Sequence, residues 1–136
     1  RIFSSDLLRA AQTARIISDR LSVPVAYLPQ FREVNNGVLA GMANERADKE
    51  YPGLYWRTLD FDEHYPGGES PHEFYDRISA AWGDLVTSVR GSGKDAALVT
   101  HGGVINVIMH IVDGIPYSNQ TPSFCIGNAE YTAVEV

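Results

Sequence analysis

Apolar positions recur at intervals of three and four residues in three parts of the chain. Residues 7–21 and 74–89 both show this period, and a shorter apolar segment runs from Val104 to about Val112. Such spacing gives a helix one apolar face, so we expect these segments to be helices packed against a core. The predicted buried face of the long central helix carries Phe74, Ile78, Ala81, Leu85 and Val89.

Short polar residues indicate where these helices begin. Residues 4–6 (SSD) supply candidate N-caps for the first helix, because their side-chain oxygens can accept hydrogen bonds from the free amides of the first turn. Asn44 is the candidate cap of a short helix that ends before Pro52. Residues 70–73 (SPHE) have the pattern of a capping box with proline at the first helical position, and residues 91–93 (GSG) end the long helix.

Four short segments are expected to be strands, namely residues 1–3, 25–28, 96–100 and 129–136. The third is a continuous apolar run, which predicts a strand buried on both faces. Strands that alternate with helices favour a mostly parallel sheet between two layers of helices, so the expected fold is a three-layer α/β/α fold. No repeat, low-complexity tract or linker divides the sequence, and we expect residues 1–136 to form a single domain.

The stretch from Trp56 to Gly68 is aromatic, acidic and rich in turn residues, which predicts a long surface loop or lid. Aromatic side chains on such a loop can shape a substrate pocket, but we favour packing of the loop itself as their role. The loop also holds residue types that can bind metals: Asp60, Asp62, Glu63 and His64. Such clusters in turn-rich loops are usually solvated, so we expect no metal site and no cofactor.

The composition narrows the choice of partners. A net charge of −6 over 136 residues opposes binding to nucleic acid or to an anionic membrane surface. No apolar run approaches the ~18 residues that a membrane span requires. An anionic ligand therefore needs a local cluster of donors. The single Cys125 cannot form an internal disulfide, which favours a reducing compartment and a cytoplasmic location, and we expect Cys125 to be a small buried hydrophobic residue.

Three side chains with useful chemistry follow predicted strands. Arg9 lies in the first turn after the opening strand, Glu33 lies just past the second, and His101 directly follows the apolar run, ahead of Gly102 and Gly103. Ligands of open α/β sheets bind at the carboxyl ends of the strands, so we expect these side chains to converge there. Arginine and helix N-termini suit a phosphate, while histidine and glutamate can move protons. Taken singly, however, an arginine in a first helical turn is usually solvated, and two glycines after a strand usually form a tight turn.

The other histidines lie in different contexts. His72 falls inside the predicted capping box and is expected at the surface, whereas His110 lies on an apolar helix and is expected to have a structural role.

The combination of motifs resembles the histidine phosphatase superfamily, the clan of cofactor-dependent phosphoglycerate mutases and related phosphatases. Residues 4–14 (SSDLLRAAQTA) are similar to its second motif, and residues 99–105 (VTHGGVI) are similar to its second catalytic-histidine motif. Residues 31–33 (FRE) resemble the segment with its acidic proton donor, and residues 66–70 (PGGES) match a turn of the phosphatase branch. The matches run in the family's order across nearly the whole chain. The resemblance implies a phosphoglycerate mutase-like fold.

The resemblance also implies a two-step phosphoryl transfer through a phosphohistidine. Arg9 would clamp the phosphoryl oxygens, Glu33 would protonate the leaving alkoxide, and His101 with the amide of Gly102 would stabilise the equatorial oxygens. The family's nucleophilic histidine lies in an Arg-His-Gly motif at the end of the first strand, and no such tripeptide occurs here. Because Arg1 reads as part of a strand already under way, we expect an upstream segment that carries the nucleophile. We expect residues 1–136 alone to be inactive.

Three functions are compatible with these residues. The leading hypothesis is a phosphomonoesterase acting on a small phosphorylated metabolite, and a phosphoglycerate mutase is the second. A mutase must hold a second acidic group of its substrate, but Arg57 is the only cation of the 56–68 loop and acidic residues outnumber it. The third hypothesis is a non-catalytic phosphate-binding or interaction protein, which would have no evident use for Glu33 and the motif around His101. The sequence leaves the oligomeric state open, and a homodimer is compatible with it.

Overall fold

A computed structural model describes residues 1–121, 124 and 126–136 of the chain. Its regular elements, in chain order, are β1 (Ile2–Ser4), α1 (Leu8–Leu21), β2 (Val25–Tyr27), the 3-10 turns η1 (Pro29–Phe31) and η2 (Gly37–Leu39), α2 (Asn44–Glu50), α3 (Pro71–Ser92), β3 (Ala97–Val99) and α4 (Gly102–Asp113). The predicted helices are therefore all present. In the described part of the chain, no helix is long and apolar enough to cross a membrane.

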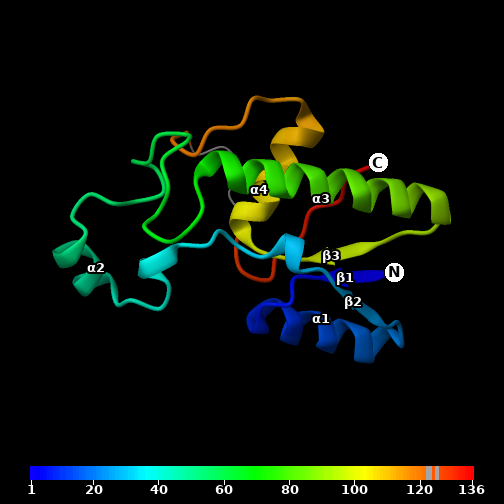
Figure 1. Cartoon of the computed structure of the whole chain (residues 1–136). Helices are drawn as coiled ribbons and strands as arrows, with labels where there is room; N and C mark the ends of the chain where they lie inside the picture. The colour runs from blue at the N-terminus through cyan, green and yellow to red at the C-terminus, as the bar shows by residue number, and fades with distance from the viewer. Residues whose placement is uncertain (122–123, 125) are drawn as a thin grey trace.

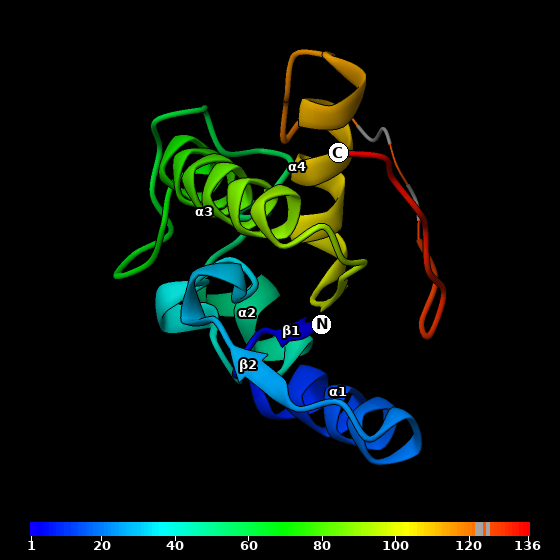
Figure 2. The same ribbon diagram turned by 90° about the vertical axis from the view of Figure 1, so that its right-hand side faces the viewer.

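The three strands form one parallel sheet in the order β2-β1-β3. Parallel neighbours need crossover connections, and α1 supplies the one between β1 and β2. Figure 1 shows α1 on one face of the sheet and α3 with α4 on the other, and the turned view of Figure 2 agrees. The fold is thus α/β with three layers, as expected, and it is phosphoglycerate mutase-like.

The core lies between the sheet and the two upper helices. The predicted face of α3 is buried at Phe74, Ile78, Ala81 and Leu85, and Val89 is partly buried against the same cluster. Val104, Val107 and Ile108 of α4 complete this core together with Phe3 and Phe31. The long helix is therefore held by burial of one apolar stripe, which is the usual source of helix stability in proteins.

The helix ends are only partly as predicted. The capping box is confirmed, because the Glu73 amide donates to Ser70 Oγ at 3.1 Å and the Ser70 amide donates to a Glu73 carboxylate oxygen at 3.3 Å. The predicted caps of the other two helices are wrong: Leu7 caps α1, and Ala43 precedes Asn44 at the start of α2. The Ser5 hydroxyl accepts from the Leu7 amide outside the helix instead.

Two strand predictions are also wrong. The segment 96–100 contains β3, but Ala97 is exposed and Leu98 and Val99 are only half-buried, because β3 is an edge strand in this sheet. Residues 129–136 form no strand. Figure 2 shows this segment running apart from β1, β2 and β3, and Tyr131 in it is 92% exposed. A strand needs a neighbour for its backbone groups, which alternating side chains alone do not provide.

The predicted loop from Trp56 to Gly68 is packed against the body of the protein. Trp56 stacks on Tyr65 with ring centroids 6.0 Å apart and meets Phe74 edge-on at 5.6 Å. Asn119 donates from its side-chain nitrogen to the carbonyls of Trp56 and Leu59, at 2.7 and 2.9 Å. These contacts support the interpretation that the loop's aromatic residues mainly hold the loop in place.

Candidate active site

The turns that follow β1 and β3 lie side by side because the strands run parallel. Ser4 is in register with Val99, and the Ser5 amide donates to the Val99 carbonyl at 2.9 Å. Ser5 and Arg9 therefore approach His101, which begins the turn from β3 into α4. This edge is the carboxyl end of the sheet, where open α/β folds bind ligands.

His101 is buried and bonded through both ring nitrogens. Its Nδ1 accepts from Arg9 Nε at 3.2 Å, and its Nε2 lies 2.8 Å from Ser5 Oγ. An arginine nitrogen can only donate, so Nδ1 carries no proton and Nε2–H donates to the Ser5 hydroxyl. The pKa of His101 is lowered to about 4, mainly by burial and to a smaller extent by the nearby Arg9 charge. The ring is therefore neutral near pH 7.

Glu33 lies next to the turn that carries His101. One carboxylate oxygen accepts from the Val34 amide and the other accepts from the Gly103 amide, both at 3.1 Å. A Cβ atom at Gly103 would lie 2.4 Å from the nearer Glu33 oxygen, whereas one at Gly102 would meet open space. A side chain at position 103 would therefore displace the Glu33 carboxylate from the Gly103 amide, whereas one at position 102 would not.

An open cavity of about 680 Å³ lies against these residues. Arg9 and Glu33 both line it, together with Arg32, Glu69 and Arg77. His101 and Gly102 are not part of its lining, and His101 is connected to it through Arg9. Thus the structure brings the three predicted side chains to one edge of the sheet, with Arg9 and Glu33 facing the cavity. Gly102 is exposed as the first residue of α4.

The three arginines at the cavity differ in their partners. Arg32 forms an exposed ion pair with Asp6, which lowers the pKa of that carboxyl. Arg77 pairs with Glu69 through two nitrogens. Arg9 has a neutral ring as its partner, and no carboxylate pairs with it in the described residues. Arg9 is therefore the cation best able to meet an anion in the cavity.

Sequence reasoning missed Arg77 and Glu69, and it placed Ser5 only as a helix cap. Glu69 falls inside the PGGES match, but Arg77 lies eight positions further along the chain, beyond the spacing at which helical neighbours pair. The contact between Ser5 and His101 spans 96 positions and follows only from the parallel register of β1 and β3.

The other histidines occupy the expected places. His110 is buried, donates from Nδ1 to the Asn106 carbonyl at 2.7 Å, and meets the rings of Tyr117 and Phe124 edge-on. His72 is exposed, and its hydrogen bond to Asp62 raises its pKa. Among the described residues, no group of three or more His, Cys, Asp or Glu side chains is arranged to hold a metal. The prediction for Cys125 lies outside the described residues.

Comparison with known proteins agrees with the resemblance. The family model for the histidine phosphatase superfamily (branch 1) matches residues 1–136. Glucosyl-3-phosphoglycerate phosphatase of Mycolicibacterium vanbaalenii is 36% identical over 96% of this chain and 60% of its own length. A probable phosphoglycerate mutase, GpmB of an Enterobacter species, is 35% identical over 85% of this chain and 54% of its own length. The chain thus spans little more than half the length of these relatives.

Solved structures give the same picture. A mycobacterial glucosyl-3-phosphoglycerate phosphatase superposes with a TM-score of 0.71 at 31% identity, over 85% of this chain and 59% of that one. The same phosphatase has also been solved with inorganic phosphate, and there the TM-score is 0.71 at 30% identity, over 88% of this chain and 61% of that one. The chain belongs to branch 1 of the histidine phosphatase superfamily.

Proposed function

We propose that the protein containing this chain is a phosphomonoesterase that acts on a small phosphorylated metabolite through a phosphohistidine. The observation that carries this proposal is the Arg9–His101 contact of 3.2 Å beside a cavity that Glu33 also lines. An arginine without a carboxylate partner and a neutral histidine that can donate suit the negative charge of a phosphoryl group, and a carboxyl group at the same sheet edge can protonate the leaving oxygen. Relatives named as phosphatases support the same reaction class.

Each residue has a separate role in the proposal. Arg9 directs its terminal nitrogens to the phosphoryl oxygens while its Nε stays on His101. His101, neutral and protonated on Nε2, donates to an equatorial oxygen when substrate displaces the Ser5 hydroxyl. The amide of Gly102, at the N-terminus of α4, adds a second donor with the favourable helix dipole. Glu33 protonates the leaving oxygen.

The nucleophile of this reaction lies outside residues 1–136, because the Arg-His-Gly motif is absent from them. His64, His72 and His110 do not substitute for it: the first two pair with carboxylates at the surface, and the third is buried against the Asn106 carbonyl. The activity therefore belongs to the full-length protein. In this proposal, residues 1–136 supply the arginine clamp, the proton donor and part of the phosphate site.

A mutase is the second candidate, and the relative named as a probable phosphoglycerate mutase favours it. A mutase needs a cation for the second acidic group of its substrate. Of the other arginines, Arg57 does not line the cavity, while Arg32 and Arg77 line it but are already paired with carboxylates. This arrangement favours the phosphatase.

A direct assay of the full-length protein separates the candidates. We expect phosphate release from small phosphomonoesters and no isomerisation of phosphoglycerate. Isomerisation that outpaces phosphate release would identify a mutase. Binding of phosphate without either reaction would identify the third candidate, a non-catalytic phosphate-binding protein.

A further inference from the structure

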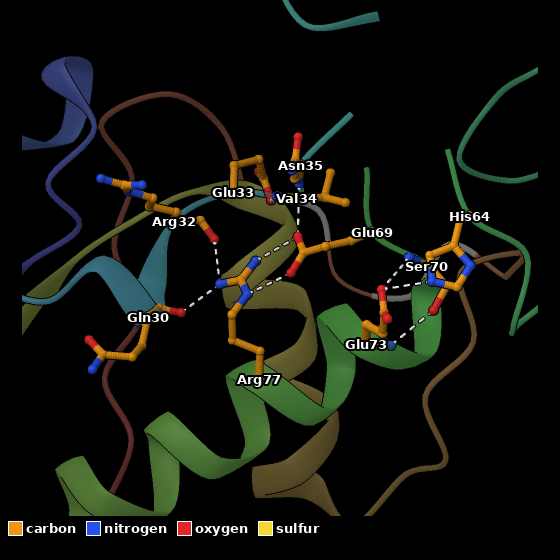
Figure 3. A network of polar contacts seen from close by, with 10 residues as sticks. All are labelled: Gln30, Arg32, Glu33, Val34, Asn35, His64, Glu69, Ser70, Glu73 and Arg77. Atoms are coloured by element: carbon orange, nitrogen blue, oxygen red, sulfur yellow. Dashed lines mark hydrogen bonds and ion pairs between the residues drawn. The ribbon is translucent and has the colours of Figure 1, made fainter. Parts of the chain in front are cut away.

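Arg77 is the centre of a polar network that joins α3 to the segment after β2. Its Nε and Nη2 donate to the two carboxylate oxygens of Glu69, at 2.7 and 2.9 Å. Its Nη1 donates to two backbone carbonyls, those of Gln30 at 2.6 Å and Arg32 at 3.1 Å. Figure 3 shows these bonds spreading from one guanidinium to both chain segments. All three guanidinium nitrogens are therefore in use.

Glu69 extends the network to the other side of Glu33. One of its carboxylate oxygens accepts from the Asn35 amide at 2.8 Å, and its own amide donates to the Asn35 carbonyl at 2.9 Å. Arg77 and Glu69 together thus hold the backbone at positions 30, 32 and 35. Glu33 lies between the last two of these, as Figure 3 shows.

Two glycines bring the same segments into close contact. A Cβ atom at Gly68 would lie 2.2 Å from the Asn35 carbonyl oxygen, and one at Gly37 would lie 2.1 Å from the Pro66 carbonyl oxygen. The Val38 amide also donates to Pro66 at 2.9 Å. The segment that carries Glu33 is therefore fixed to the turn before α3 by backbone as well as by side chains.

The anchor of this network is rigid. Arg77 lies in the second turn of α3, whose start is fixed by the capping box and whose inner face is buried in the core. Its guanidinium also lies over the Phe74 ring, 5.2 Å from the centroid. The Arg77 and Glu69 side chains are only 26% and 19% exposed. An arginine fork can make these bonds together, whereas a lysine ammonium cannot reproduce their geometry.

We propose that Arg77 and Glu69 are positioning residues for Glu33. They hold the Arg32–Asn35 backbone so that the Glu33 carboxylate stays against the Gly103 amide and faces the cavity. This inference rests on the proposed function, in which Glu33 protonates the leaving group. Arg77 is not a substrate clamp, because Glu69 already neutralises its charge and each of its three nitrogens already donates a hydrogen bond.

The test uses the dependence of the rate on the leaving group, measured on the full-length protein. An alkyl phosphate such as glycerol phosphate needs protonation of its leaving oxygen, whereas p-nitrophenolate leaves without much help. We expect Arg77→Lys to lower kcat/KM for the alkyl ester by about 10- to 100-fold, and that for p-nitrophenyl phosphate by about threefold or less. Glu69→Gln should show the same selectivity. Arg46→Lys, in an exposed Arg–Glu pair on α2, is the matched control and should change neither rate.

Thermal unfolding of each variant shows whether the protein stays folded, and Glu69→Gln serves as the test if Arg77→Lys does not fold. Glu33→Gln separates the two levels of the argument. Suppose that Glu33→Gln loses activity mainly on the alkyl ester, while the folded Arg77 and Glu69 variants lose activity equally on both esters or not at all. That result would overturn the positioning role and leave the proposed function intact. A wild-type protein that releases no phosphate, or a Glu33→Gln protein without leaving-group selectivity, would overturn the proposed function as well.

Discussion

Arg9 and Arg77 line the same cavity but are held in opposite ways. The Arg77 guanidinium is matched by a carboxylate and two carbonyls, and every one of its nitrogens donates. Arg9 makes one side-chain hydrogen bond in the described residues, from Nε to a neutral imidazole. Its charge is therefore not neutralised, and its two terminal nitrogens are open to a ligand. One arginine stabilises the wall of the site, and the other is available to bind.

The contrast shows why charge alone does not identify a phosphate clamp. Both residues are arginines at the rim of one cavity, and only their partners distinguish them. A paired arginine would have to break strong charge-assisted bonds before it could bind a substrate. An arginine oriented by a neutral histidine keeps its geometry without losing its charge.

The largest expected effect comes from removing the free cation. Arg9→Met in the full-length protein should lower kcat/KM for phosphomonoesters by about 10²–10³-fold, because it removes donors to the charge that develops on the phosphoryl group. Arg15→Met is the control, since Arg15 is exposed on the same helix and lies outside the cavity lining. Equal losses in the two variants would show that Arg9 acts only through helix stability or net charge.

The next effect concerns the contact between Glu33 and the His101 turn. Gly103→Ala places a methyl group 2.4 Å from a Glu33 oxygen, so the carboxylate or the turn must move. We expect it to lower the free energy of unfolding by about 1–2 kcal/mol, because the movement breaks the hydrogen bond from the Gly103 amide to the Glu33 carboxylate. Gly102→Ala meets open space and should leave the free energy of unfolding unchanged or raise it slightly, as measured by urea unfolding. If the two variants were equally stable, Glu33 would not be held as described.

Stability should also depend on pH through His101. Its pKa is about 4 when folded and near 6.5 when unfolded, so the unfolded state binds more protons between these values. The stability that neutral His101 contributes is present above pH 6.5 and is lost as pH falls towards 4. Between pH 7 and pH 5 the free energy of unfolding should fall by about 1–2 kcal/mol from this residue. Urea unfolding at the two pH values should show a smaller loss for His101→Asn than for wild type.

A second histidine must be controlled in that experiment. The raised pKa of His72 acts in the opposite direction, because its stabilisation is present at low pH and is lost as pH rises. Measuring His101→Asn in a His72→Gln background removes this contribution. An identical pH dependence with and without His101 would show that the ring is not buried in its neutral form.

The smallest expected effect is the coupling between Arg77 and Glu69 in stability. A double-mutant cycle with Arg77→Met and Glu69→Ala should give a coupling of about 0.5–1 kcal/mol, since the pair is largely buried and shares backbone partners. The corresponding cycle on the exposed Arg46–Glu50 pair should show no measurable coupling. Equal coupling in both pairs would remove the distinction between a wall-stabilising arginine and an ordinary surface pair.

Local patterns were sufficient to predict most of the fold. The apolar stripe of α3 and its capping box are properties of neighbouring residues, and both appear as expected. The prediction of a strand at residues 129–136 was wrong because a strand depends on a partner elsewhere in the fold, which its own residues do not specify. The prediction that β3 is buried on both faces was wrong for the same reason, since burial of an apolar run depends on which strands and helices surround it.

The position of the site was predictable because the carboxyl ends of parallel strands lie at one edge of the sheet. That rule brings Arg9, Glu33 and His101 to one edge, and the structure places them there. The hydrogen bonds of Arg77 to Gln30 and Arg32 cross 47 and 45 positions, and no sequence spacing predicts them. The difference between Gly102 and Gly103 likewise appears only when the position of Glu33 is known.

The most direct test of the proposed reaction is to trap the phosphoenzyme. The full-length protein is mixed with a labelled phosphomonoester, quenched and digested, and the labelled peptide is mapped by mass spectrometry. The account predicts an acid-labile phosphohistidine outside residues 1–136, whose amount falls sharply in Arg9→Met. A label on His101, or on any other residue within this chain, would contradict it.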